Sequence, residues 1–181
     1  MMRISRVVTG LSAVCAALCL GAMAALADIT PFVGDYKGSA DVLSVDGTST
    51  PRDMSVKIRD TKDGFSVEWT SVSYKSDGRV KEASYAISFV PSQRDGVYAA
   101  AMTRNVFGHA VQLDPMKGEP FVWGRIDGDT MTVYSLFVDD VGGYEIQQFD
   151  RTLAQGGLML EFTNLRNGQL QRSVTTFLER Q

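Results

Sequence analysis

Apolar and polar residues alternate along most of this chain, in short runs that glycine-containing dipeptides separate. After residue 120 the runs are FVWGRI, TMTVYSLFV, YEIQQFDRTL, LMLEFTNL and LQRSVTTFLE. Successive side chains of a β-strand point to opposite faces, so each run is typical of a half-buried strand. The dipeptides between them are Asp127-Gly128, Gly142-Gly143, Gly156-Gly157 and Asn167-Gly168. Because glycine adopts positive φ angles without a steric penalty, these dipeptides predict tight hairpin turns.

The first half of the chain has the same pattern. Residues 34–42 place glycines and apolar residues on one face and charged or hydroxyl residues on the other. Glycines on the apolar face indicate a strongly bent strand, or one that another backbone approaches closely. Further alternating runs follow the turns at Asp46-Gly47, Asp63-Gly64, Asp77-Gly78 and Asp95-Gly96. We therefore expect five strands before residue 103 and five after residue 120.

This succession of hairpins predicts an all-β fold. No stretch shows the 3.6-residue periodicity of a long helix. An open meander of this length would expose two strand edges, which promote aggregation, and closure into a barrel removes them. The predicted fold is an antiparallel up-and-down β-barrel of about 8–10 strands. A two-sheet sandwich is the alternative, although sandwiches usually need long crossovers and this chain has few.

Residues 1–27 have the features of a signal peptide. Two arginines near the start precede an apolar core that reaches about Leu20, and Ala25-Leu26-Ala27 matches the pattern before a cleavage site. We expect cleavage near Ala27, which leaves a single periplasmic or secreted domain, residues 28–181. A retained membrane anchor is the alternative for this segment.

Charge and cysteine content limit the classes of function. Cys15 and Cys19 precede the expected cleavage site, so the mature domain would have no disulfide. Removing Arg3 and Arg6 leaves 16 basic against 21 acidic residues, a formal charge of −5. This charge, without a basic cluster, argues against nucleic-acid binding. No later stretch is apolar for long enough to form a transmembrane helix.

Candidate catalytic groups are few. After the signal peptide the sequence contains no cysteine, no Gly-x-Ser-x-Gly motif and one histidine, which leaves no usual nucleophile–base pair. A zinc site would need clustered histidine and cysteine ligands. Asp139-Asp140 lies at a predicted turn, where aspartate is expected for turn geometry alone. We therefore expect no catalytic residue and no metal site, and we favour a protein that is not an enzyme.

The segment 103–120 interrupts the strand pattern and contains the single histidine, His109. Long loops in compact domains often carry function, so this one is a candidate portal over a barrel mouth. The alternative is a short strand or helical turn that closes one end. His109 would need a deep apolar cavity to act as a haem ligand, and haem is the one cofactor that we consider.

Aromatic residues in the middle of the strands are the candidate lining of a ligand cavity. A barrel of about ten strands is wider than side chains alone comfortably fill, which favours such a cavity. The predicted ligand-binding residues are Trp69, Tyr85, Trp123, Arg125, Tyr134 and His109. The alternative is that the aromatic residues fill a solid core and that Arg125 lies outside. Between Tyr144 and Leu153 the apolar residues change face near Gln147-Gln148, which indicates a β-bulge.

The head of the first strand, Gly34-Asp35-Tyr36, resembles the Gly-x-Trp motif of the calycin barrels, with tyrosine in place of tryptophan. This group includes the lipocalins and the fatty-acid-binding proteins. In these barrels an arginine of the last strand packs on the tryptophan. The resemblance, which covers residues 28–181, implies that Gly34 and Tyr36 close the barrel together with Arg172 or Arg180. It also implies the binding of a small molecule.

Taken together, these patterns favour a periplasmic, lipocalin-like, non-enzymatic protein that binds a small, mostly apolar ligand. Two alternatives stay open. One is an envelope protein-interaction adaptor with a solid barrel. The other is an isomerase-like, cyclase-like or haem-binding barrel that uses His109.

Overall fold

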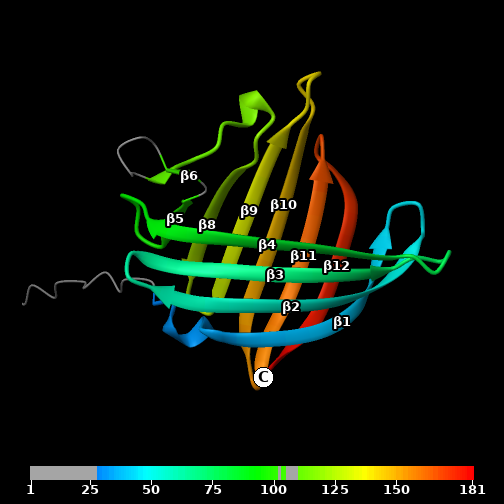
Figure 1. Cartoon of the computed structure of the whole chain (residues 1–181), viewed down its shortest axis with the longest axis horizontal. Helices are drawn as coiled ribbons and strands as arrows, with labels where there is room; N and C mark the ends of the chain where they lie inside the picture. The colour runs from blue at the N-terminus through cyan, green and yellow to red at the C-terminus, as the bar shows by residue number, and fades with distance from the viewer. Residues whose placement is uncertain (1–27, 102, 105–109) are drawn as a thin grey trace, which may run out of the picture.

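The computed structural model describes residues 28–101, 103, 104 and 110–181, and its strands form a closed antiparallel barrel (Figure 1). The barrel strands are β1 (Gly34–Ser44), β2 (Ser49–Thr61), β3 (Gly64–Tyr74), β4 (Val80–Pro91), β5 (Val97–Ala100), β8 (Phe121–Asp127), β9 (Thr130–Val138), β10 (Tyr144–Ala154), β11 (Gly157–Arg166) and β12 (Gln169–Arg180). Each strand pairs with the next barrel strand, and β1 pairs with β12. The prediction of an all-β up-and-down barrel is confirmed.

Three small elements complete the described chain. The ribbon of β6 (Thr103–Arg104) and β7 (Ala110–Val111) is separate from the barrel sheet. The 3-10 turns η1 (Thr30–Phe32) and η2 (Pro115–Lys117) precede β1 and β8, respectively. In the ranges that the structure describes, no helix has the length and hydropathy needed to cross a bilayer.

The turns fall where the glycine dipeptides predicted them. Gly128, Gly142 and Gly156 have φ angles of 56°, 80° and 83°, in the left-handed region that favours glycine. Asn167 and Gly168 both have positive φ, as a type I′ hairpin turn requires. These residues explain why β8 to β12 follow one another as simple hairpins.

Asp139 stabilises the turn between β9 and β10. Its carboxylate accepts hydrogen bonds from the backbone N–H of Gly143 at 2.7 Å and of Val141 at 3.2 Å, and from Arg166 at 2.9 Å. The hydrogen bond from Gly143 is the largest of the causes that lower the pKa of Asp139. These contacts give Asp139 a structural role at the turn.

The junction of β1 and β12 closes the barrel. An added Cβ atom on Gly38 would lie only 2.5 Å from the carbonyl oxygen of Phe177 on β12. The two backbones therefore come together at a position where only glycine fits, which confirms the close approach expected from the glycines of the first strand.

Contacts of Tyr36 fix η1 against the same junction. Arg180 donates to the Tyr36 hydroxyl at 2.8 Å, and its guanidinium carbon lies 5.3 Å from the centre of the tyrosine ring. The Tyr36 hydroxyl donates to the carbonyl oxygen of Phe32 at 2.8 Å. Of the two arginines considered for this contact, Arg180 makes it, whereas Arg172 lies near the other end of β12.

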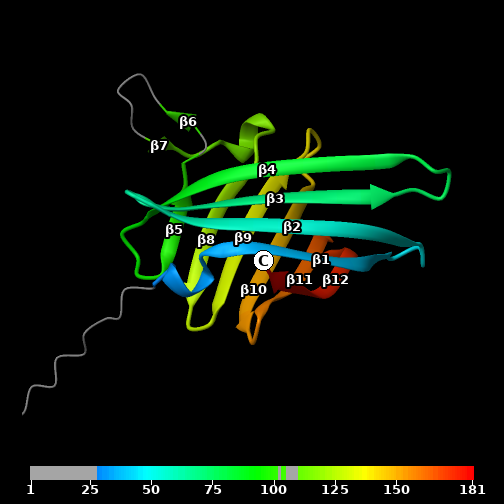
Figure 2. The same cartoon turned by 60° about the horizontal axis from the view of Figure 1, so that its bottom comes forward.

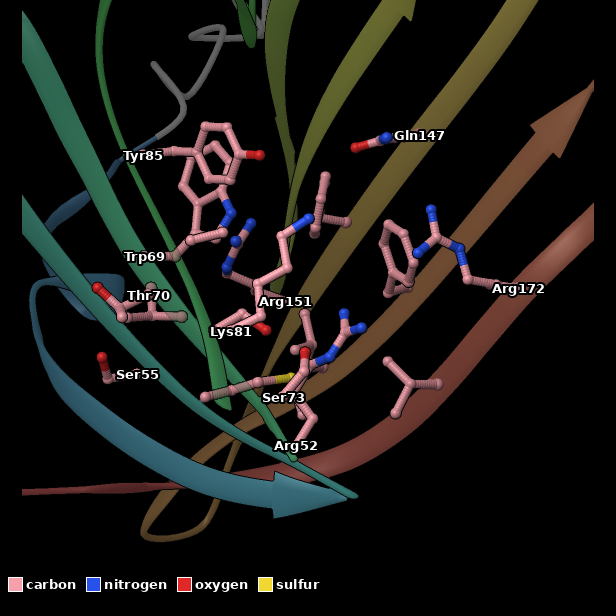
Figure 3. Close-up of a pocket in the computed structure, with 18 of the residues that line it drawn as sticks. Arg52, Ser55, Trp69, Thr70, Ser73, Lys81, Tyr85, Gln147, Arg151 and Arg172 are labelled. Carbon is pink, nitrogen blue, oxygen red and sulfur yellow. The ribbon is translucent and has the colours of Figure 1, made fainter. Parts of the chain in front are cut away.

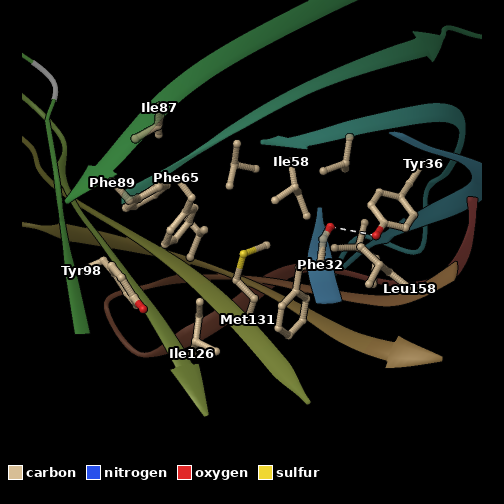
Figure 4. Packing of buried hydrophobic residues seen from close by; sticks show 14 of the residues in the cluster. Phe32, Tyr36, Ile58, Phe65, Ile87, Phe89, Tyr98, Ile126, Met131 and Leu158 are labelled. Atoms are coloured by element: carbon tan, nitrogen blue, oxygen red, sulfur yellow. Dashed lines mark hydrogen bonds between the residues drawn. The ribbon is translucent and has the colours of Figure 1, made fainter. Parts of the chain in front are cut away.

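The half of the interior next to η1 is a packed apolar core (Figure 4). Phe32, Phe65 and Met131 are buried at its centre. The Phe65 ring stacks on Phe89 and meets Tyr98 edge-on, with both centroid distances 4.9 Å. This end of the barrel is solid.

The other half of the barrel is less completely closed. Strands β1 to β4 cross in front of β8 to β12 (Figures 1 and 2). Strand β4 pairs with β5 only over residues 89–91. Over residues 80–87, β4 pairs with β3 on one side and with no described strand on the other. One side of the barrel wall therefore lacks a continuous backbone ladder.

The bulge predicted in β10 is wrong. Strand β10 keeps an unbroken register with β9 and with β11, and the register shift lies between Asn164 and Leu165 of β11 instead. The sequence of β10 changes polarity because Glu145 and Gln147 point into the barrel together with Phe149. Polar inward residues, rather than an extra residue, produce the change of pattern.

Candidate functional site

The less closed half of the barrel contains a cavity of about 310 Å³ (Figure 3). Its walls are formed by β2, β3, β4, β10, β11 and β12. A second cavity of about 290 Å³ adjoins it and opens between β4 and the strands β8 and β9. The two cavities share the lining residues Trp69, Tyr85, Gln147 and Phe149. Together they form a hollow above the solid core.

Strand register places the aromatic side chains of this hollow. Trp69 of β3 is opposite Val56 of β2 and Tyr85 of β4, so all three share the inner face. The Trp69 and Tyr85 rings stack with centroids 5.2 Å apart and an interplanar angle of 25°. Tyr85 is 56% exposed even though it points inward. An inward ring with this exposure shows that the hollow is open to solvent.

Two further rings continue this aromatic wall. Phe149 of β10 lies 5.5 Å from Trp69 and 4.7 Å from Phe162 of β11, centroid to centroid. The wall therefore extends across the barrel from β4 to β11 and gives the cavity an apolar side, although only Trp69 and Tyr85 stack and the other rings are tilted.

Five positively charged side chains are also among the residues that line the cavity. They are Arg52, Lys75, Lys81, Arg151 and Arg172. None of the described residues that line it is an aspartate or a glutamate. The whole chain has a net formal charge of −3. The cavity therefore carries a positive charge, whereas the net charge of the protein is negative.

Arg151 lies at the floor of the cavity and is only 1% exposed. Its guanidinium carbon is 5.6 Å from the centre of the Phe149 ring and 5.9 Å from that of Trp69. Its Nε and Nη1 atoms have no hydrogen-bond partner among the described residues. Burial lowers the pKa of Arg151 to about 10, although the neighbouring Asp150 opposes the shift. The side chain is therefore still a cation at neutral pH.

Arg52 and Arg172 enter the cavity from β2 and β12 (Figure 3). The pKa of Arg52 is lowered by burial and, to a smaller extent, by the positive charge of Arg172. Within the described ranges, neither of them nor Arg151 forms an ion pair with a carboxylate. The three guanidinium groups are thus not paired directly with a carboxylate, although the nearby charge of Asp150 favours the charged form of Arg151.

Glu145 lies near this cluster but is bound to amide groups. Its Oε1 atom accepts from Nδ2 of Asn164 and from Nε2 of Gln147, both at 2.8 Å. Asn164 is 1% exposed, and its Oδ1 atom has no partner in the described structure. In the described chain, no group of three or more His, Cys, Asp or Glu residues is placed to hold a metal ion.

Three residues predicted to line the cavity lie on the outer face of the barrel. Gly124 is opposite the buried Val133, and an added Cβ atom on it would contact Phe89, so its neighbours Trp123 and Arg125 point outward. Tyr134 is opposite Trp123 and stacks on it at 4.7 Å. The expected inward position of Trp123, Arg125 and Tyr134 is therefore wrong. Trp123 and Arg125 instead line a pocket of about 690 Å³ outside the barrel, and a binding role for these residues stays a prediction.

Arg125 instead forms an ion pair with Asp127 on the outer surface. Residues of β8 alternate between the two faces as predicted, but the faces are the reverse of those expected. Gly124, the smallest residue, lies on the inner face, where the rings of Phe65 and Phe89 occupy the space. Trp69 and Tyr85 do lie in the cavity, and their role in binding stays a prediction. His109 and part of the segment 103–120 lie outside the described residues.

Sequence reasoning placed none of the three arginines in the cavity, although it considered Arg172 for the closure of the barrel. Arg52, Arg151 and Arg172 each stand two positions from an inward apolar residue, namely Met54, Phe149 and Val174. Strand periodicity therefore placed them on the inner face, where charged residues are rarely found without a partner. A charged residue at a position that the strand period places on the inner face was therefore the sequence feature that could have indicated these arginines.

The chain matches no protein-family model, and no curated protein resembles it significantly. Function must therefore be inferred from the chemistry of the barrel interior.

Proposed function

We propose that this protein binds a small molecule in the hollow half of its barrel. In this proposal residues 1–27 are removed near Ala27, and the barrel acts in the periplasm or outside the cell as a lipocalin-like binding protein without catalytic activity. The ligand enters between β4 and the strands β8 and β9, where the second cavity opens.

The observation that carries this proposal is the contrast between the two halves of the interior. One half is filled by side chains such as Phe32, Phe65 and Met131. The other half contains two adjoining cavities beside a wall of aromatic rings, of which Trp69 and Tyr85 stack. A barrel that served only as a docking surface would have no need for this hollow, so the contrast favours a binding protein over a solid adaptor.

A variant that fills the cavity tests the proposal. Ala83 of β4 lines the cavity, whereas Ala86 is exposed on the outer face of the same strand. We expect the wild-type protein to bind the neutral fluorescent probe N-phenyl-1-naphthylamine. Ala83→Trp should weaken this binding by about tenfold or more, because the indole ring occupies the site. Ala86→Trp should bind the probe like the wild type.

Folding is checked by circular dichroism, so that loss of binding is not confused with loss of structure. Native mass spectrometry of the protein purified from its own cells should in addition detect a co-purifying small molecule. Equal binding by the wild type and Ala83→Trp would contradict a site in the cavity.

A further inference from the structure

We propose that the ligand of this cavity carries an anionic group with two or more negative charges next to a flat apolar portion. The inference rests on the proposed function, because it names the chemical class of the ligand that the hollow accepts. Phosphate monoesters and dicarboxylates of aromatic compounds belong to this class.

The charge of the cavity is the first argument. Burial of a charge is costly unless a partner compensates it, and Arg151 is almost completely buried with two nitrogen atoms unpartnered in the described structure. A single anion close to Arg151 would compensate this cost. The described lining of the first cavity contains no carboxylate, and Glu145, which lines the adjoining cavity, accepts hydrogen bonds from Asn164 and Gln147.

The number of cations indicates more than one negative charge. Arg52 lies close enough to Arg172 for the repulsion between them to lower its pKa. Arg52, like Arg151, also has a buried Nε atom without a hydrogen-bond partner in the described structure. Guanidinium groups bind carboxylate and phosphate oxygens through paired hydrogen bonds. Three such groups from three strands suit a group with several oxygens and more than one charge.

The position of the aromatic wall specifies the rest of the ligand. The guanidinium of Arg151 lies beside Trp69, and Trp69 stacks on the exposed ring of Tyr85 (Figure 3). An anion held by Arg151 therefore has a flat apolar surface directly beside it. A ligand that joins an aromatic ring to an acidic group makes both contacts at once.

A series of three ligands with one ring system tests this inference. The probes are 1-naphthol, 1-naphthoate and 1-naphthyl phosphate, at about pH 8, where a phosphate monoester carries close to two negative charges. Isothermal titration calorimetry should show affinity rising in this order. We expect about tenfold between successive members, because each adds charge-assisted hydrogen bonds.

Charge-removing variants locate the effect. Arg52→Gln and Arg172→Gln should each weaken 1-naphthyl phosphate about tenfold and leave 1-naphthol unchanged. These side chains are only partly buried, so both variants are expected to fold. The matched control is Lys57→Gln, since Lys57 is exposed on the outer face of β2 and its loss changes the net charge equally. It should bind all three ligands like the wild type.

The outcomes separate this inference from the proposed function. Equal affinity for the three ligands, unaffected by Arg52→Gln and Arg172→Gln, would overturn the inference and leave the binding function standing. If inorganic phosphate bound as tightly as 1-naphthyl phosphate, the inference that the ligand has a flat apolar portion would be wrong. Failure of all three ligands and of N-phenyl-1-naphthylamine to bind would overturn the proposed function itself.

Discussion

Arg151 shows at the scale of a single residue how stability and binding compete in this barrel. Among the described residues, Arg151 is the one charged side chain that is fully buried. Its guanidinium lies over the rings of Trp69 and Phe149. Cation–π contacts compensate only part of the cost of removing a guanidinium from water. A side chain in this state is better explained by a bound anion than by the stability of the empty barrel.

This reasoning predicts that Arg151→Met makes the protein more stable. A flexible apolar side chain removes the buried charge and fills much of the same volume. We expect the free energy of unfolding in urea to rise by about 1–4 kcal/mol, the range found when buried ion pairs are replaced by apolar residues. The same variant should lose its preference for 1-naphthyl phosphate over 1-naphthol.

Arg180 provides the matched comparison, because its guanidinium has partners. It donates to the Tyr36 hydroxyl and to the carbonyl oxygen of Pro31. Arg180→Met should therefore lower the free energy of unfolding, by about 1 kcal/mol. If Arg151→Met destabilised the barrel as much as Arg180→Met, the charge of Arg151 would not carry the cost that we assign to it.

At the scale of the strand, turn chemistry and alternation predicted most of the fold. Glycine dipeptides located the hairpins because few other residues adopt positive φ angles. Alternation identified the strands but did not decide which face of β8 is inward. The large Trp123 points outward and the small Gly124 points inward, whereas large apolar residues are expected inside. The pattern of β10 differs from the prediction for a related reason, since three of its five inward residues, Glu145, Gln147 and Arg151, are polar.

Gly38 allows a prediction about closure of the barrel. A side chain at this position would collide with the backbone of β12, where the clash cannot be relieved by a rotamer change. Gly38→Val should therefore lower the free energy of unfolding by about 1–3 kcal/mol, the usual cost of overpacking. Hydrogen exchange should show the loss of protection concentrated in the β1–β12 pairs.

The matched control for this variant is Ser39→Val, on the outer face of the same strand. It adds a β-branched side chain at an exposed position of β1, so its stability should stay close to that of the wild type. Equal stability of the two variants would show that the close contact between β1 and β12 does not limit closure.

At the scale of the whole molecule, the barrel is solid at the η1 end and hollow at the other. The closed topology follows from the sequence, since ten antiparallel strands, most of them linked by hairpins, must cover their edges. The hollow does not follow from it, because whether inward side chains fill a barrel depends on how its two walls cross. Arg52, Arg151 and Arg172 come from three different strands, and they meet in one cavity because of the register between the strands, which the sequence alone does not reveal.

Methionine methyl groups provide the most direct test of a ligand inside this hollow. Met54 lines the cavity, Met131 is buried in the solid core, and Met159 is exposed on the outer face of β11. With methyl-labelled protein and 1-naphthyl phosphate, we predict intermolecular nuclear Overhauser effects from the naphthyl protons to Met54 and none to Met131 or Met159. Contacts to Met159 without contacts to Met54 would show that the ligand binds outside the barrel and would contradict the account.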